Sequence, residues 1–199
     1  MKAVNPCGLT RAALINDLSC FGKCSLRVLM PILSSYGVET VPLPTAILST
    51  HTGGFTGFVA QDMTENMRLF AAHWKKLGVK FDAIITSVGS EGRIGYLARP
   101  DGRVTLVQKE AVDMTVHGAG DVFTSALSGE LLSRQAPQTA LLRAADFCDS
   151  CIHETAKRQP SHWYGLAFEE ILRRRLFKNE QYNKREGPEP VVRKPSGAD

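Results

Sequence analysis

The sequence lacks the features that mark membrane and secreted proteins. No apolar run in its 199 residues approaches the roughly 18–20 residues that a bilayer-spanning helix needs. A signal-peptide pattern is missing as well, because Asn5, Pro6 and Gly8 interrupt the N-terminus before an apolar stretch forms. We therefore expect a cytoplasmic protein without a membrane partner. At 43% hydrophobic residues, the chain is expected to fold around a core.

Cysteine is too scarce, and odd in number, for a disulfide framework. Five cysteines without a secretory signal favour reduced thiols. Cys20 and Cys24 are four residues apart, and a second cluster holds Cys148, Cys151 and His153. These spacings fit zinc patterns poorly, and the second cluster falls within an apolar helical pattern. Buried free thiols are therefore the preferred interpretation, and a zinc site is the alternative.

An excess of positive charge is missing from most of the chain. The formal net charge is +4, yet residues 172–199 alone hold eight Lys or Arg against four Asp or Glu, and the rest holds 16 of each sign. The basic balance belongs to the C-terminal end, so no nucleic-acid partner is expected. Pro, Gly, Glu and Lys dominate from Lys178 onward, and residues 178–199 are predicted to form a disordered basic tail.

Strand-like and helix-like patterns alternate in the remaining chain. Short β-prone runs predict strands over 12–15 and 81–88, and a hairpin with arms at 94–98 and 104–108. The run 41–49 is β-prone too, but its two prolines predict an irregular edge. Apolar residues at helical spacing predict helices over 24–36, 64–77 and 166–176, and helices that start at Gly120 and near Pro137. This alternation predicts a layered α/β fold.

The strongest chemical signal is a glycine motif ahead of an apolar helix, His117-Gly118-Ala119-Gly120-Asp121. Small residues let the backbone turn tightly, and N–H groups at a helix N-terminus favour an anion such as a phosphate. Asp121 falls in the first helical turn, where a carboxylate can accept the proton of a hydroxyl that attacks a phosphoryl group. A plain glycine turn with a favourable helix-start charge is the alternative.

Three further segments carry polar side chains in a loop or near the end of a predicted strand. They are His51 and Thr52 in the glycine-rich loop 49–55, Asn16 and Asp17 after the first strand, and Thr86 and Ser87 near the end of 81–88. Strand ends are where α/β proteins tend to place ligands, and hydroxyls can bond phosphate oxygens. The loop suits a small polar ligand that approaches the backbone closely, with a plain solvent loop as the alternative.

Two parts of the chain resemble the bacterial pyridoxal/pyridoxamine kinases of the ribokinase-like superfamily. The segments INDLSCFGKCSL (15–26) and PLPTAILSTHTGGF (42–55) are similar to the N-terminal half of these kinases, and HGAGDVFTSA (117–126) is similar to their C-terminal signature. The resemblance covers the chain from Ala12 to about Leu176. It implies a three-layer α/β/α domain over 1–177 that uses ATP and Mg to phosphorylate the hydroxymethyl group of a B6 vitamer, and it implies a homodimer.

The resemblance also implies roles for individual residues. Asp121 takes the role of the base that activates the hydroxyl. The amides of Gly118, Ala119 and Gly120 form the anion hole for the transferring phosphoryl group. The implied substrate contacts are Asn16, His51 and Thr52, and the implied contacts to ATP phosphates are Thr86 and Ser87. Ala119 stands where pyridoxal kinases more often carry Thr.

One block of the resembled family is absent. The strand at 81–84 is similar to one that ends the N-terminal part, and Thr86 belongs to a segment found several βα units later, so the sheet is predicted to be shortened at about 84–85. The absent block supplies central strands and an acidic Asp-Pro-Val-type segment near the magnesium. Asp62, Asp82 and Glu91 are interpreted as surface charges, so the metal ligands stay unknown. The alternatives are a non-catalytic remnant that binds nucleotide or vitamer, and a hydroxymethylpyrimidine kinase.

Overall fold

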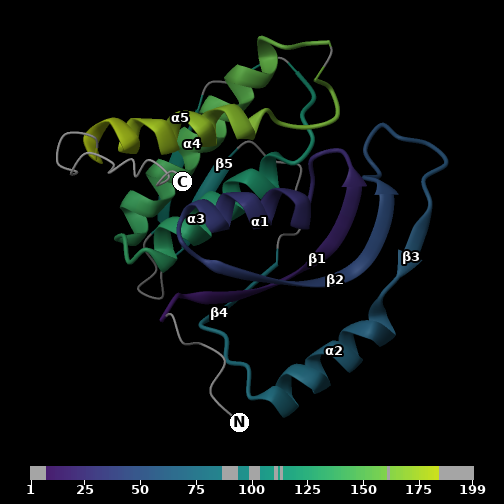
Figure 1. Ribbon diagram of the computed structural model, residues 1–199. Helices are drawn as coiled ribbons and strands as arrows, with labels where there is room; N and C mark the ends of the chain where they lie inside the picture. The colour runs from purple at the N-terminus through teal and green to yellow at the C-terminus, as the bar shows by residue number, and fades with distance from the viewer. Residues whose placement is uncertain are drawn as a thin grey trace, which may run out of the picture.

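The structure is a computed structural model that describes residues 8–86, 94–98, 104–109, 112, 114–160 and 162–183. These residues form a mixed α/β fold with a four-stranded sheet, a two-stranded hairpin and five helices (Figure 1). The elements in chain order are β1 (Arg11–Phe21), α1 (Leu26–Ser35), β2 (Glu39–Thr50), β3 (Ala60–Asp62), α2 (Thr64–Leu77), β4 (Ala83–Ile85), β5 (Ile94–Ala98), β6 (Val104–Gln108), α3 (Ala119–Leu132), α4 (Pro137–Ala156) and α5 (Phe168–Asn183). The predicted α/β class is confirmed.

The first strand is longer than the sequence predicts. The sheet has the order β3-β2-β1-β4, and β1 runs parallel to both of its neighbours. Its pairing with β2 continues to Phe21 opposite Thr50, so Asn16 and Asp17 lie within the strand rather than in a loop after it. The predicted strand ends at residue 15, where the apolar run ends. In the structure, backbone pairing with β2 extends β1 through the polar residues that follow.

The prediction that residues 41–49 form an irregular edge holds for the stretch with the prolines but not for residues 46–48, where β2 pairs with both β1 and β3. Pro44 stands opposite Asn16, and Ile47 stands opposite Leu18, so three residues of β2 face two of β1. This bulge lies directly after Pro44, and bulges are positions where a strand tolerates proline. The antiparallel partner β3 pairs only from Ala46 to Leu48. The stretch of β2 that holds the prolines therefore has a strand on one side.

Helix α1 covers one face of the sheet and joins it to the C-terminal helices. Figure 1 shows α1 and α3 next to each other on this side. The cluster between α1 and the sheet consists of Ala12, Leu14, Leu26, Leu29, Leu33, Val38 and Ile85. The second cluster joins α1 to α3, α4 and α5 through residues that include Val28, Ile32, Val122, Ala126, Phe147, Cys151 and Leu172. Apolar residues at helical spacing give these helices apolar faces, and the faces pack together in the two clusters.

Cys148 and Cys151, which belong to the candidate zinc cluster of the sequence, are free thiols. Cys148 and Cys151 are buried in α4, and burial raises the pKa of Cys148 to about 12. Cys20 and Cys24 are free as well. No group of three or more His, Cys, Asp or Glu among the described residues could hold a metal ion. Buried thiols, rather than a zinc site, thus account for Cys148 and Cys151.

The described residues cover little of the opposite face of the sheet. Helix α2 lies on this side (Figure 1), and its predicted end at Gly78 is confirmed by a left-handed φ of 68° at that glycine. None of the α2 side chains is buried, although the helix is amphipathic. Ile84 of β4 is 69% exposed, so the prediction of a buried strand holds for Ile85 but not for Ile84. A thin second layer fits a sheet that is shortened after β4.

Substitutions on this face are therefore expected to have small effects. Leu69→Ala in α2 removes a side chain that is 59% exposed, so we expect the free energy of unfolding to change by no more than about 0.5 kcal/mol. Urea unfolding of the variant measures this change. Leu29→Ala in α1, at a fully buried position, is the positive control and is expected to destabilise clearly. Equal losses in both variants would contradict the exposed placement of α2.

The last helix extends further than the sequence predicts. Helix α5 runs to Asn183, whereas residues from Lys178 onward were expected to lack structure; residues 184–199 lie outside the described part. Glu170 pairs with Arg173 at 2.7 Å and with Arg174 at 3.0 Å, and such pairs stabilise a helix. The described helices, α5 included, do not combine the length and apolar character that a bilayer crossing requires.

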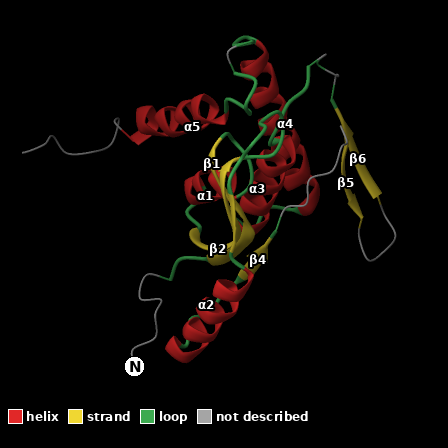
Figure 2. Cartoon of the chain, turned by 90° about the vertical axis from the view of Figure 1, so that its right-hand side faces the viewer, coloured by secondary structure: helices red, strands yellow, loops and turns green. Residues whose placement is uncertain are grey.

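The predicted hairpin is confirmed. Strands β5 and β6 pair antiparallel, from Ile94 opposite Gln108 to Ala98 opposite Val104. Figure 2 shows this hairpin beside α4 and apart from the main sheet. Both of its strands contact α4. The Pro-Asp-Gly turn between the strands lies outside the described residues.

Candidate functional site

Asp121 lies in the first turn of α3 and reaches the start of α1. Its Oδ2 accepts a hydrogen bond of 2.8 Å from the backbone N–H of Ser25, the residue before α1. The Ser25 hydroxyl donates to Asp17 Oδ1 at 2.5 Å. Ser25 has a φ of 57°, a conformation that is costly for a non-glycine residue and that often marks functional positions. Ser25 thus links two carboxylates, one from β1 and one from α3.

The glycine motif packs tightly against the loop between β1 and α1. Gly118 has a φ of 80°, and a Cβ atom there would lie 2.1 Å from the carbonyl oxygen of Lys23. Ala119 and Gly120 follow as the first residues of α3. The N–H groups of a first helical turn have no acceptor within the helix. The three predicted anion-hole residues therefore lie at a helix N-terminus next to Asp121, as the motif predicts.

Cys24 precedes Ser25, and its thiol is affected by the charges of both carboxylates. Burial, followed by the charges of Asp121 and Asp17, raises the pKa of its thiol to about 12. A nucleophilic cysteine needs a lowered pKa, so this arrangement excludes Cys24 as a nucleophile near neutral pH.

Two predicted ligand contacts from different strands meet beside this group. Thr86 Oγ1, directly after β4, donates a hydrogen bond of 3.1 Å to Asn16 Oδ1 in β1. Asn16 is buried and precedes Asp17, whose Oδ2 accepts from Ser19 Oγ at 2.9 Å. Ser87 lies outside the described residues. The structure therefore joins the Asn16 and Thr86 pair to the Asp17–Ser25–Asp121 link through consecutive residues of β1.

His51 is held in one orientation by two backbone groups. Its Nδ1 accepts from the Gly53 N–H at 3.1 Å, so the ring proton is assigned to Nε2, which lies 3.0 Å from the Tyr164 carbonyl oxygen. The side chain is buried, whereas its neighbour Thr52 is exposed. Gly22 approaches the ring so closely that a Cβ would lie 2.0 Å from it. This neutral tautomer presents a fixed imidazole at the end of β2.

Aromatic and imidazole rings from four parts of the chain surround His51. We call them the aromatic wall, which consists of Phe21, His51, Phe55, His117, Trp163 and Tyr164. The His117 ring centroid is 5.2 Å from that of His51, and Phe55 is 4.7 Å from Trp163. Because His117 directly precedes Gly118, the aromatic wall adjoins the glycine motif.

Two histidines of this region make stability depend on pH. Burial lowers the pKa of His117 and of His162 below 6.5; His51 adds to the shift at His117, and Lys23 adds to the shift at His162. The unfolded chain therefore binds more protons than the folded protein below about pH 6.5, and stability falls as pH decreases through this range. His117→Gln is expected to flatten this decline, measured by urea unfolding at pH 7.5, 6.5 and 5.5. His73→Gln on the surface of α2 is the control, and an equal flattening there would contradict the assignment.

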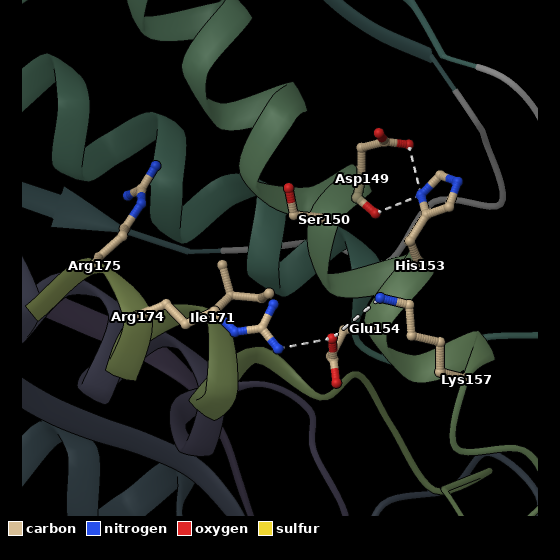
Figure 3. Close-up of a pocket in the computed structure, with 8 residues that line it drawn as sticks. All are labelled: Asp149, Ser150, His153, Glu154, Lys157, Ile171, Arg174 and Arg175. Carbon is tan, nitrogen blue, oxygen red and sulfur yellow. Dashed lines mark hydrogen bonds and ion pairs between the residues drawn. The ribbon is translucent and has the colours of Figure 1, made fainter. Parts of the chain in front are cut away.

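A hollow lies elsewhere in the molecule. It has a volume of about 540 Å³ and lies between the second half of α4 and α5, as Figure 3 shows. Its lining residues are Asp149, Ser150, His153, Glu154, Lys157, Ile171, Arg174 and Arg175. Glu154 pairs with Arg174 at 3.3 Å and with Lys157 at 3.7 Å, so these charges largely satisfy one another. None of the predicted site residues lines this hollow, and we do not assign the site to it.

Several residues of the candidate site carry no signal in the sequence analysis. Ser25 acts through its backbone N–H, which no side-chain pattern reveals. Lys23 and Trp163 belong to irregular segments without periodicity, and only the fold brings them to the glycine motif and to the aromatic wall. The left-handed φ of Ser25 has no compositional mark either, because such positions are usually glycine or asparagine.

Comparisons with known proteins find the same fold in solved structures of kinases. No protein-family model and no curated protein matches the chain. A Bacteroides thetaiotaomicron structure assigned as a phosphomethylpyrimidine kinase is 23% identical, with a TM-score of 0.77 over 85% of this chain and 95% of that one. Pyridoxal kinase from Lactobacillus plantarum is 17% identical, with a TM-score of 0.77 over 87% and 99% of the two chains. Leishmania donovani pyridoxal kinase in complex with ADP and pyridoxine is 11% identical, with a TM-score of 0.63 over 82% and 94%. At these identities the likeness shows the fold alone, and the expected α/β fold is the one that these kinase structures share.

Proposed function

We propose that the protein transfers the γ-phosphoryl group of ATP to the hydroxymethyl group of a B6 vitamer. The observation that carries this proposal is the position of Asp121, at the N-terminus of α3 and hydrogen-bonded to Ser25. A proton acceptor and a cluster of backbone amides that favours anions thereby lie side by side. The fold shared with pyridoxal kinases supports this assignment, as does the complex of one of them with ADP and pyridoxine.

In this reaction, Asp121 accepts the proton of the substrate hydroxyl. The hydroxyl oxygen then forms a bond to the γ-phosphorus, and the bond from this phosphorus to the β–γ bridging oxygen breaks, which releases ADP. The amides of Gly118, Ala119 and Gly120 stabilise the negative charge of the group in transfer. The Ser25 N–H orients the Asp121 carboxylate for proton transfer.

The aromatic wall supports a flat heteroaromatic substrate. Stacking and edge contacts with aromatic rings favour such a molecule. We propose that His51 contacts a polar substituent of the ring, with Thr52 and Asn16 nearby. Thr50, next to His51, has a buried hydroxyl without a hydrogen-bond partner among the described residues, and a ligand substituent would satisfy it. A hydroxymethylpyrimidine shares this chemistry and is the competing substrate.

The described residues of the proposed site suit ATP phosphates better than they suit a magnesium ion held by protein side chains. Thr86 and Ser87 are the proposed contacts for ATP phosphates, of which Thr86 lies beside Asn16. Asp17 accepts hydrogen bonds from two serine hydroxyls, and Asp121 accepts one from the Ser25 N–H. The described residues hold no cluster of three or more metal-ligating side chains. The described residues therefore offer no all-protein cage for a magnesium ion, and we assign no step to one.

A direct assay tests the proposal. Purified protein with ATP, magnesium and either pyridoxal or hydroxymethylpyrimidine is expected to form a phosphate ester that mass spectrometry detects. A higher kcat/KM for pyridoxal would support the B6 assignment, and a higher value for the pyrimidine would replace it. No ester above background with either substrate would refute the kinase proposal.

A second candidate function is a protein that binds nucleotide or vitamer without turnover, since the described residues hold no group of three or more metal-ligating side chains. Calorimetry with pyridoxal and with a non-hydrolysable ATP analogue distinguishes the two functions. Binding without ester formation would favour the second candidate. The homodimer and the cytoplasmic location stay predictions of the sequence.

A further inference from the structure

We infer that Lys23 is a positioning residue, which holds the loop between β1 and α1 so that Ser25 and Gly118 keep Asp121 and the anion hole in place. This inference rests on the proposed function. Lys23 itself contacts neither the Asp121 carboxylate nor the substrate hydroxyl in the proposed reaction. It would act through the backbone of its own loop, residues 21–25.

The Lys23 side chain is fixed by partners from the C-terminal part of the chain. It is only 11% exposed, and its Nζ lies 2.6 Å from Glu169 Oε2 and 2.9 Å from His162 Nε2. Because an ammonium group only donates, His162 must accept through Nε2 and is neutral. Burial together with the Lys23 charge lowers the pKa of His162, which agrees with this state. The amine also lies 5.4 Å from the centre of the Phe168 ring.

The Lys23 backbone is clamped as closely as its side chain. Its N–H donates to the Tyr164 carbonyl oxygen at 3.1 Å. Its own carbonyl oxygen lies against Gly118, where a Cβ would approach to 2.1 Å. Gly165, with a φ of 146°, leaves room for the Lys23 side chain, since a Cβ there would lie 2.4 Å from Lys23 Cβ. Three segments that are distant in sequence therefore meet at Lys23.

Lys23 lies two residues before Ser25, whose N–H is the hydrogen-bond donor to Asp121. The Ser25 N–H donates to Asp121 Oδ2, and the Lys23 carbonyl oxygen lies against Gly118. A shift of Lys23 would therefore move both the donor to Asp121 and the backbone against which Gly118 packs. Stability alone explains the buried lysine poorly, because the cost of removing an ammonium from water offsets much of what its ion pair contributes. The polar contacts of Lys23 fix the position of the loop, and an apolar residue of similar size would not reproduce this effect.

The test compares Lys23→Met with the conservative variant Lys23→Arg. We expect Lys23→Met to lower kcat about 10-fold to 100-fold with KM for ATP changed less than about threefold, because small displacements of reacting groups have effects of this size. Lys23→Arg is expected to recover most of the loss. Lys109→Met breaks an exposed ion pair with Asp146 and is expected to leave kcat unchanged.

A second readout does not depend on catalysis. The amide resonance of Ser25 in a ¹H–¹⁵N spectrum reports its bond to Asp121, and Lys23→Met is expected to shift it while Lys109→Met does not. Glu169→Gln, at a side chain that is 57% exposed, keeps the fold and is expected to shift the resonance in the same direction. An unchanged Ser25 resonance in both site variants would overturn the inference, even if Lys23→Met lowers the melting temperature. If the wild-type protein forms no ester, the kinase proposal fails while this readout still decides the role of Lys23.

Discussion

Asp121→Asn is expected to lower kcat for phosphoryl transfer by about 10²–10⁴-fold, the usual contribution of a general base. Asparagine has nearly the shape of aspartate, and its side-chain oxygen can still accept the Ser25 N–H. It cannot take a proton from the substrate hydroxyl. The rate of ATP-dependent ester formation measures the loss, and the affinity for ATP is expected to change little.

Asp17→Asn is the matched control for this variant. Asp17 also bonds to Ser25, through its hydroxyl, but it lies on β1 rather than at the glycine motif. We expect it to reduce kcat far less than Asp121→Asn does. Both variants should unfold at urea concentrations close to that of the wild type. If Asp121→Asn kept its kcat within about threefold, or if Asp17→Asn lost as much, Asp121 would not be the base.

Gly118→Ala is expected to destabilise the protein by roughly 2–5 kcal/mol. A left-handed conformation costs a residue with a Cβ about 1–2 kcal/mol, and forcing an extra methyl group into packed surroundings costs about 1–3 kcal/mol. Both penalties apply, since Gly118 has a φ of 80° and its Cβ would lie 2.1 Å from the Lys23 carbonyl oxygen. The neighbour is backbone and cannot rotate away. Urea unfolding measures the change.

Gly120→Ala is the control two residues further along. A Cβ at Gly120 meets nothing within 4 Å, and the position lies within α3. Alanine is favoured over glycine in helices, so a stabilisation of up to about 1 kcal/mol is expected. A loss in Gly120→Ala comparable to that in Gly118→Ala would contradict the close contact with the Lys23 carbonyl oxygen as the cause of the Gly118 effect.

The order and type of the elements could largely be predicted from the sequence. The periodicity of α2 and the glycine after it predicted that helix to its last residue, and Pro137 marked the start of α4. Errors arose where pairing between strands overrode local composition. The extension of β1 to Phe21 and the interior position of β2 depend on a partner strand and on a bulge next to Pro44. Neither has a mark within the strand itself.

The sequence by itself supplied the candidate residues of the site. The glycine motif predicted Asp121 as a base, and the resemblance to pyridoxal kinases implied the roles of His51 and Thr86. Only the tertiary structure decided which groups hold them. Ser25 bonds to Asp121 across 96 positions of the chain, and Lys23 reaches Glu169 across 146. Such contacts depend on how α1, α3 and α5 pack together, and packing is a property of buried surfaces that no local pattern of residues encodes.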